Sequence, residues 1–595
     1  MREFMERFVR LHQLVIEAFE RDYGAIMERT ITGDCYNRWD SPNLKLAAGS
    51  YLALYFLDHP SNPGRGQRKY LDRYVELSDC WLRAWEEAPG RAEPFAEWVV
   101  HLLLWGMERM EESGIADPER RRRVERLAAG HIERWTPEPF FWTAPNHEIW
   151  RLAVTCIAGR LFQRKDWLDT AAFCLERLLE YQTPEGFWEE GRHHGPSMSY
   201  NGVALLPLVL LAEETGNAGI LNAARRLATF ITRWTFPDGV RIGAFDGRVV
   251  TGPGYFGVAG AGLDVIPEGA ALMRRCLAFW DRAGWLEGPH SVGPSRVGTY
   301  GMGGAAAIAL DRAARVKDAV DVPLAMDVPG AVLENHSPYF NAVLRRQGSW
   351  CIALSGQLSD APKIGQSVFR LERQNRMEIW HERASVVVGG GHNRVADEQA
   401  FFNVSVDSGH EGDDVVGTDR LELRRSRIFP RAADCGVDGA VSWLVLSFKH
   451  AAVRFEVEPR GDAIEIRYRF RCRGVRELRL MLPLVVWRGG ECFVDGGKAL
   501  GEHERIPVRG EVTVRTSAWD ARTRIEIPRA GSTFALGLMD CASGTSTGLG
   551  EEPFRPYLRR CLLETVFTNP DGEGEGKWTV DVSAGLEHPN REEAR

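Results

Sequence analysis

The spacing of apolar residues changes once along this 595-residue chain, and that change constrains the fold more than any other feature. Before about residue 320, apolar residues recur three and four positions apart, which is typical of amphipathic helices. Beyond that point they alternate with polar residues, as in Ile464-Glu465-Ile466-Arg467-Tyr468. Such alternation is typical of half-buried antiparallel strands. The sequence therefore predicts a helical domain followed by a β-sandwich.

A short proline-containing junction separates the two patterns, from Asp321 to Gly330. We expect a helical solenoid or a closed α/α toroid over residues 1–320, a linker over 321–330 and an antiparallel β-sandwich over 331–588. Two or more domains are expected because a chain of this length exceeds one core. Helices joined in consecutive hairpins are predicted over 5–22, 43–57, 68–86, 94–110, 119–133, 148–162, 167–181, 199–214, 218–233 and 267–281.

Composition excludes several classes of protein. Hydrophobic residues make up 44% and charged residues 26% of the chain, and the net charge is −8. An acidic chain without basic runs argues against nucleic-acid binding. No apolar run is long enough to span a membrane, and no signal-peptide pattern opens the sequence. We therefore expect a cytoplasmic protein, or a secreted one if a signal was removed.

The eleven cysteines form no CxxC pair. We expect no metal site and no cofactor, and the sequence does not fix the oligomeric state.

Two polar segments each end a loop and begin an apolar helical run. The first, Pro145 to Trp150, contains Asn146 and His147. The second, Gly186 to Gly202, contains Tyr200, about one helical hairpin later. An amide, an imidazole and a phenol at comparable helix starts suit the abstraction of a proton next to a carboxylate.

Cleavage of a uronic-acid glycan by β-elimination requires that chemistry. The C5 proton must leave, the C6 carboxylate must be neutralised, and the leaving oxygen must receive a proton. We expect Asn146 to neutralise the carboxylate and Tyr200 or His147 to move protons. Each residue also has a structural interpretation: Asn146 as a helix N-cap, His147 as a hydrogen-bonding residue, and Tyr200 as a core aromatic.

Further candidates for contacts with an anionic oligosaccharide or polysaccharide surround these segments. Aromatic rings can stack on sugars, and charged or imidazole groups can bind their hydroxyls and carboxylates. Each candidate is equally compatible with a core or surface role. The predicted substrate-binding residues are Arg38, Trp142, Trp188, Glu190, His193, His194 and Tyr255, and Trp150 is a further possible sugar platform.

The stretch from Glu185 to Val203 resembles a segment of the heparinase II/III-like and related chondroitin and hyaluronate lyases, in which a Gly-containing turn precedes a Tyr at a helix start. Asn146-His147-Glu148-Ile149 resembles the preceding Asn-containing segment of that family. The resemblance implies an N-terminal incomplete α/α toroid followed by a C-terminal antiparallel β-sandwich. It also implies that Tyr200 is the general acid and a candidate base, while Asn146 neutralises the carboxylate and His147 assists it or acts as the base.

The sequence departs from the family in one place. Residues 363–372 lack the His-x-His-x-Asp-like segment that many members carry in the first strands of the sandwich. His336, His381 and His392 lie nearby without that motif.

Two alternative functions therefore stay open. One is a glycoside hydrolase using a pair of carboxylates, drawn from Glu189, Glu190, Asp238 and Asp246. The other is a glycan-binding protein without catalysis.

Overall fold

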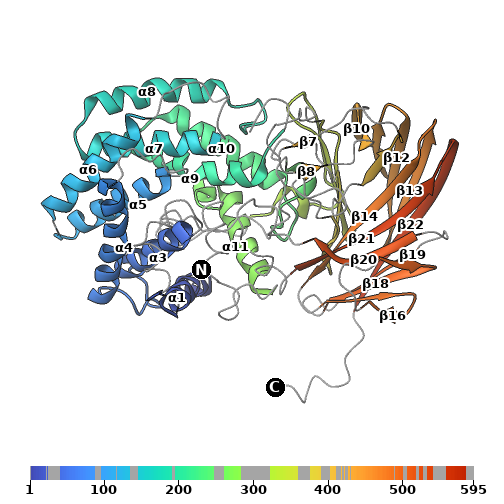
Figure 1. Ribbon diagram of the computed structural model, residues 1–595, viewed down its shortest axis with the longest axis horizontal. Coiled ribbons are helices and arrows are strands. Elements are labelled where there is room, and N and C mark those ends of the chain that lie inside the picture. The colour runs from blue at the N-terminus through green and yellow to red at the C-terminus, as the bar shows by residue number, and fades with distance from the viewer. Residues whose placement is uncertain are drawn as a thin grey trace, which may run out of the picture.

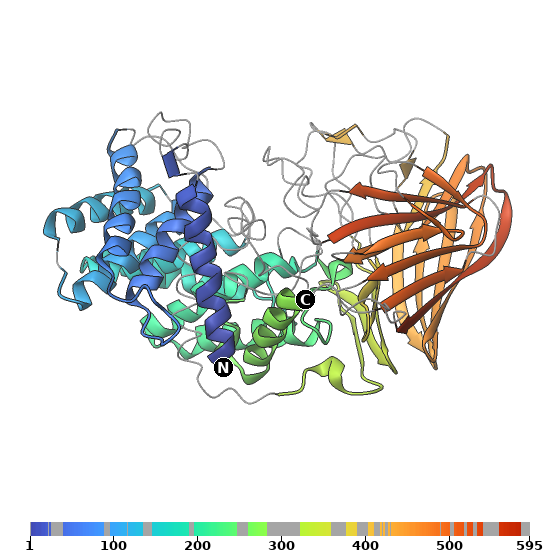
Figure 2. The same cartoon turned by 90° about the horizontal axis from the view of Figure 1, so that it is seen from below.

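The computed structural model describes residues 2–21, 23–24, 40–87, 96–115, 117–134, 145–189, 195–246, 260–282, 322–358, 376–389, 403–409, 417–418, 421–422, 427–428, 430–487, 490–499, 505–516, 521–526, 532–539 and 558–584. Figures 1 and 2 show the helices at one end of the molecule and the β-sheets at the other. A helical domain followed by an antiparallel β-sandwich is therefore confirmed.

The helices pack in two layers. Helices α3, α5, α7 and α9 contact one another in succession and form the inner layer, while α4 contacts α6 and α8 contacts α10 outside them. Because helices alternate in direction along a chain of hairpins, the inner helices run parallel and their first turns lie at one rim. The helices are α1 (Arg2–Arg21), α3 (Asp40–Phe56), α4 (Arg68–Glu87), α5 (Ala96–Glu112), α6 (Pro118–Ile132), α7 (Pro145–Leu161), α8 (Lys165–Glu180), α9 (Met198–Thr215), α10 (Ala218–Arg233) and α11 (Pro267–Arg282).

The burial patterns explain this layering. Outer helix α10 buries one face, and its N-cap Asn217 accepts hydrogen bonds from the backbone N–H groups of Gly219 and Ile220. Inner helix α7 buries nearly all its side chains. A helix that is apolar around most of its circumference needs neighbours on several sides. The sequence pattern of α7 therefore places it between other helices.

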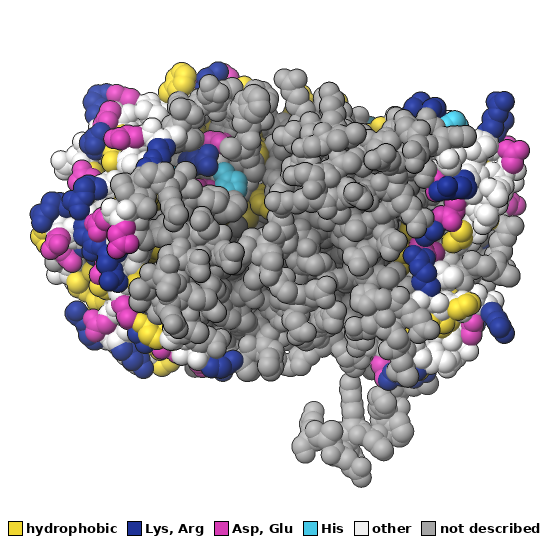
Figure 3. Space-filling view, viewed as in Figure 1, with side chains coloured by type: hydrophobic (Ala, Val, Ile, Leu, Met, Phe, Trp, Pro, Cys, Tyr) yellow, Lys and Arg dark blue, Asp and Glu magenta, His cyan; other side chains and the backbone are white. Residues whose placement is uncertain are grey.

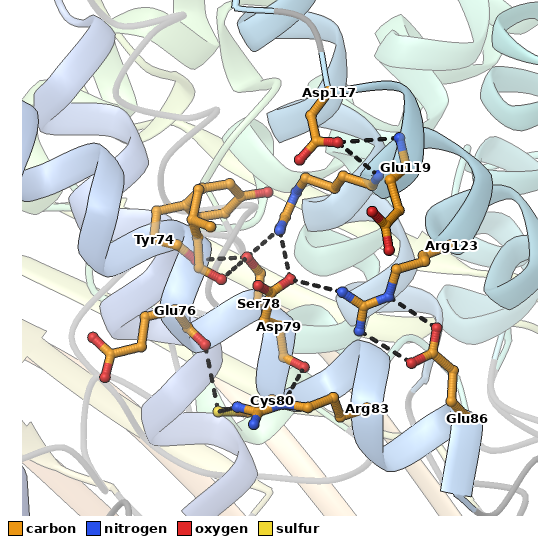
Figure 4. Close-up of polar contacts among 12 residues, drawn as sticks. Tyr74, Glu76, Ser78, Asp79, Cys80, Arg83, Glu86, Asp117, Glu119 and Arg123 are labelled. Atoms are coloured by element: carbon orange, nitrogen blue, oxygen red, sulfur yellow. Dashed lines mark hydrogen bonds and ion pairs between the residues drawn. The ribbon is translucent and has the colours of Figure 1, made fainter.

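An ion-pair network joins outer helices α4 and α6 (Figure 4). Arg120 is buried, and its guanidinium donates to Asp79 at 2.8 Å and also to the hydroxyl of Ser78. Arg123 contacts Asp79 at 3.3 Å and forms a two-pronged pair with Glu86 at 2.9 and 3.1 Å. Removing the charge of Asp79 would leave the buried Arg120 guanidinium without an anionic partner. That would lower the free energy of unfolding.

The strands form two large antiparallel sheets. The order in the eleven-stranded sheet is β1-β2-β3-β4-β5-β14-β21-β20-β17, with β6 pairing to β14 and β9, and in the nine-stranded sheet it is β10-β11-β12-β13-β22-β19-β18-β15-β16. Strands β7 and β8 pair separately. The strands are β1 (Val332–His336), β2 (Asn341–Gln347), β3 (Trp350–Ser355), β4 (Met377–His381), β5 (Ser385–Val388), β6 (Val404–Asp407), β7 (Gly417–Thr418), β8 (Leu421–Glu422), β9 (Arg427–Ile428), β10 (Ala432–Asp438), β11 (Val441–Ser447), β12 (Ala451–Arg460), β13 (Ala463–Cys472), β14 (Glu477–Trp487), β15 (Glu491–Val494), β16 (Gly497–Lys498), β17 (Arg505–Val508), β18 (Glu511–Thr516), β19 (Ala521–Glu526), β20 (Ser532–Met539), β21 (Leu558–Thr568) and β22 (Gly572–Ala584).

An aromatic cluster holds the sandwich against the helices. The Phe340 ring, which is fully buried, contacts the rings of Trp234 at 4.8 Å, Phe230 at 5.3 Å, Phe245 at 5.5 Å and Phe187 at 6.2 Å. Edge-to-face aromatic contacts add to the free energy of apolar burial. The loop that carries Phe187 is therefore fixed between the helices and the sandwich.

The ten predicted helices agree with the observed helices to within a few residues at each end. The first strand begins at Val332, and the predicted domain limits remain predictions.

Lys and Arg are interspersed with Asp and Glu over the helical end of the face in Figure 3. Within the described part of the chain, no helix is both long and apolar enough to cross a membrane.

Candidate active site

The first turn of α7 presents Asn146. The helix begins at Pro145, a residue preorganised for this position. Asn146 is 1% exposed, and among the described residues neither its amide nitrogen nor its amide oxygen has a hydrogen-bond partner. The interpretation of Asn146 as a helix cap is wrong, because it lies inside the helix and its side chain accepts no backbone N–H. Burying an amide without hydrogen bonds lowers the stability of the folded protein. The presence of Asn146 here therefore indicates a functional role.

The first turn of α9 presents Tyr200, which is half-buried. The helix follows Ser197, whose hydroxyl donates to Asp246 at 3.3 Å. The next residue, Asn201, contrasts with Asn146. Its amide donates to the carbonyls of Trp188 and Ser197 and accepts from the Trp188 backbone N–H, each at 3.0 Å. Asn201 therefore has a structural role that anchors the loop before the helix.

One hydrogen bond fixes the register of α7 and α9. The Trp150 indole N–H donates to the Val203 carbonyl at 3.2 Å. Trp150 lies one turn after Asn146, and Val203 lies about one turn after Tyr200. Because the two helices run parallel, their first turns lie side by side at the rim of the inner layer.

His147 is held from the neighbouring inner helix α5. Its Nδ1 is hydrogen-bonded to a carboxylate oxygen of Glu97, and its ring lies 5.1 Å from that of Trp98. Glu97 is 1% exposed, and its second oxygen is 3.9 Å from the Arg151 guanidinium. Burial raises the pKa of the Glu97 carboxyl, but the hydrogen bond from His147 and the attraction of His147 and Arg151 outweigh it and lower that pKa.

Glu97 is a site residue that the sequence did not reveal. An acidic residue in the first turn of a helix is ordinary, because it complements the helix dipole. Its partner His147 lies 50 residues away, so only the packing of α5 against α7 reveals the pair. His101, one turn further along α5, packs on the Trp150 ring at 4.8 Å, and burial lowers its pKa to about 3. His101 is therefore a neutral core residue.

Two tryptophans proposed as sugar platforms are core residues instead. Trp188 is 2% exposed and its indole donates to the Leu178 carbonyl at 3.0 Å. Trp150 is fully buried. Neither ring has a face open to a sugar, because both side chains are buried and Trp150 packs on His101 of α5. The remaining predicted contacts lie outside the described residues: Arg38, Trp142, Glu190, His193, His194 and Tyr255.

Among the acids considered for a hydrolase, Asp238 lies between the helical domain and the sandwich and is hydrogen-bonded to the sandwich. Its carboxylate accepts hydrogen bonds from the Trp380 indole at 2.8 Å and the Ser385 hydroxyl at 2.6 Å. Burial raises the pKa of this carboxyl, against the opposing effect of those hydrogen bonds. Asp246 is buried beside Ser197. These contacts give both acids a structural explanation.

Two of the sandwich histidines named from the sequence lie in described residues. His381 is fully buried on β4, its ring lies 4.5 Å from that of Trp350, and its Nδ1 accepts the Arg383 N–H. Burial lowers its pKa to about 4. His336 is hydrogen-bonded to Asn341 and Glu334 on the exposed β1 hairpin. Within the described residues, no cluster of three or more His, Cys, Asp or Glu could hold a metal ion.

No protein-family model and no curated protein matches the chain. Solved structures do match it. Heparinase III aligns with a TM-score of 0.51 and 9% identity over 91% of this chain and 76% of its own. The Streptomyces coelicolor A3 chondroitin AC lyase, in complex with chondroitin sulphate, aligns with a TM-score of 0.52 and 12% identity over 98% and 83%. A mutant of that lyase gives a TM-score of 0.52 at 13% identity, again over 98% and 83%.

These matches confirm that the chain has a fold like that of the heparinases and other polysaccharide lyases. The resemblance noted in the two polar segments therefore extends to the architecture as a whole. At this level of identity the likeness concerns the fold, and the role of each side chain must be argued from the site.

Proposed function

We propose that this protein is a lyase that cleaves uronic-acid-containing glycans by β-elimination. The observation that carries the proposal is the buried amide of Asn146, which has no partner among the residues that the structure describes. It lies in the first turn of α7, beside the first turn of α9 with Tyr200. This amide lowers the stability of the fold, and its presence is explained if it binds a group of the substrate.

The amide would meet the C6 carboxylate. Removal of the C5 proton places negative charge next to that carboxylate, and hydrogen bonds that strengthen as the charge develops lower the barrier. The parallel first turns of α5, α7 and α9 add the positive ends of three helix dipoles at the same rim. Together these features supply the local attraction for an anion that an acidic chain needs.

Tyr200 would remove the C5 proton and return a proton to the leaving O4. One residue can do both when the proton and the leaving oxygen lie on the same face of the sugar, because its oxygen then reaches both. His147 would assist Asn146 in holding the uronate, because its Nε2 can accept a hydrogen bond from a substrate hydroxyl. The burial of His381 in the sandwich core supports this assignment, since that histidine has no route to a substrate.

An anionic glycan is the substrate class that this chemistry selects. The matched chondroitin AC lyase was solved with chondroitin sulphate, which supports that class. Elimination leaves a C4–C5 double bond that absorbs ultraviolet light, and it consumes no water. Incubation with heparan, chondroitin, hyaluronan, ulvan and alginate should therefore generate absorbance with at least one glycan, and the masses of the fragments should sum to that of the substrate without added water.

The Tyr200→Phe variant tests the mechanism. It should lose nearly all turnover, by about 10³-fold, because the phenol oxygen moves both protons. A matched control is Tyr70→Phe, which changes a half-buried tyrosine on outer helix α4 and should stay within about twofold of the parent. Products that contain one added water would instead identify a hydrolase. Binding without product across the whole glycan panel would identify a non-catalytic glycan-binding protein.

A further inference from the structure

Glu97 is a buried carboxylate whose two oxygens are engaged differently. One oxygen is hydrogen-bonded to His147, whereas the other is 3.9 Å from the Arg151 guanidinium, beyond hydrogen-bond reach. Arg151 also pairs with Glu148 at 3.2 Å. The imidazole is therefore the closest donor to Glu97, and Arg151 balances charge from a greater distance.

The hydrogen bond determines which nitrogen of His147 carries the proton. An ionised carboxylate only accepts hydrogen bonds, so Nδ1 must be the donor. The Trp98 ring, 5.1 Å away and tilted by 44°, packs against the same imidazole. The His147 side chain is only 14% exposed, so the two contacts together restrict both its tautomer and its rotamer.

Stability alone does not explain a buried charge at this position. An apolar residue of similar volume generally serves a fold as well as a buried ion pair, or better. The pair joins two inner helices at the turn of α7 that also carries Asn146, whose amide has no partner in the described part of the chain. A function for the imidazole accounts for retention of the carboxylate behind it.

We propose that Glu97 is a positioning residue: it holds His147 by Nδ1–H, so that the lone pair of Nε2 faces the substrate and accepts a hydrogen bond from a sugar hydroxyl. This inference rests on the proposed lyase function. It adds a residue from a third inner helix, α5 (Ala96–Glu112), to the predicted site on α7 and α9.

The test has a readout that does not require activity. Nitrogen-15 NMR of protein labelled at histidine distinguishes Nδ1–H from Nε2–H imidazoles, and the His147→Gln variant identifies the signal of His147. We expect Nδ1 to be protonated in the parent protein. We expect the signal to change to the Nε2–H form, which predominates in water, in Glu97→Leu. Glu97→Gln keeps the shape and one acceptor oxygen, so it should retain the parent pattern.

Activity on the glycan that the parent cleaves completes the test. Glu97→Leu should lower kcat/KM about 10²-fold, and Glu97→Gln should recover most of that loss. Glu214→Gln is the matched control, because Glu214 pairs with Arg160 near the other end of α7. It should stay within about twofold. Circular dichroism and thermal unfolding verify that each variant folds.

The outcomes separate the two proposals. An active parent whose His147 signal and kcat/KM are unchanged in Glu97→Leu overturns the positioning role and leaves the lyase assignment intact. A changed signal with unchanged kcat/KM also overturns it, because the imidazole geometry would then not matter to the reaction. A parent that is inactive on every glycan overturns the proposed function, whatever the NMR spectrum shows.

Discussion

Replacing Asn146 by leucine should make the protein more stable and inactive. The amide of Asn146 is buried, and neither of its polar atoms is hydrogen-bonded within the described part of the chain. Folding therefore removes its bonds to water without replacing them. Leucine has nearly the same volume and no polar atoms. If the amide is retained for a substrate carboxylate, removing it should relieve the cost and abolish turnover together.

The size of the effect follows from the burial. An unsatisfied buried polar group costs about 1–3 kcal/mol, and Asn146 has both a donor and an acceptor in that state. Leucine also has a higher helix propensity than asparagine, by about 0.5 kcal/mol. Allowing for imperfect packing, we expect Asn146→Leu to raise the free energy of unfolding by about 2–3 kcal/mol. That corresponds to about 4–6 °C in Tm for a large domain.

Asn201 provides the matched control. It is also a buried asparagine in the first turn of an inner helix, but its amide makes three hydrogen bonds to backbone groups of Trp188 and Ser197. Asn201→Leu removes those bonds and leaves their partners unpaired. It should therefore lower the free energy of unfolding by about 2–4 kcal/mol.

Urea unfolding followed by circular dichroism, with thermal unfolding alongside, measures both variants. Turnover is followed by ultraviolet absorbance on a glycan that the parent cleaves. A loss of stability in Asn146→Leu as large as that in Asn201→Leu would refute the reasoning, because it would mean that the amide of Asn146 contributes to the fold.

Three further predictions concern the framework around the site. Gly186 has a φ of +107°, and an added Cβ would lie 2.7 Å from a backbone carbonyl oxygen, so Gly186→Ala should cost more than about 2 kcal/mol in urea unfolding. Gly216→Ala, at a φ of +64° with open space around it, should cost about 1 kcal/mol, and equal losses would contradict the steric argument. Asp79→Asn leaves the buried Arg120 without its anionic partner and should cost about 2–3 kcal/mol in the same assay, an effect that a loss below about 0.5 kcal/mol would disprove. The folded-state pKa of His101 is about 3 and its unfolded value about 6.5, so the unfolded chain binds the proton first and stability falls as pH drops below about 6.5. His101→Leu should remove about 2 kcal/mol of the stability lost between pH 7 and pH 5 in urea titrations, and an unchanged pH dependence would show that His101 is not buried as a neutral group.

Most of the fold could be predicted from the sequence because most elements bury one face only. The strands β12 and β13 alternate buried and exposed residues along much of their length, as their sequences do. Strand β14 is an exception, since nearly all of it is buried. It lies in the middle of its sheet, and Trp487 at its end packs on Phe279 of α11 at 5.1 Å. A strand covered on both faces has no alternation for a sequence pattern to reveal.

The site was predictable only where its residues are close in sequence to a helix start. Asn146, His147 and Tyr200 follow loops and precede apolar runs, so their positions at the first turns could be read from the sequence. Glu97 could not, because its contact with His147 depends on the packing of two helices. Trp188 was misassigned because an aromatic beside a polar segment is equally suited to a sugar or to a core.

The arrangement of hairpins explains why the candidate residues are separated by about fifty positions. In a two-layer array, one hairpin of some fifty residues returns the chain to the same rim, so each inner helix can contribute a first turn to one site. The His147–Glu97 contact spans 50 residues and the Trp150–Val203 contact spans 53. A rim built this way draws on α5, α7 and α9 without any sequence repeat. The side chains at each first turn can therefore differ in chemistry, as carboxylate, amide, imidazole and phenol, while the backbone that positions them stays the same.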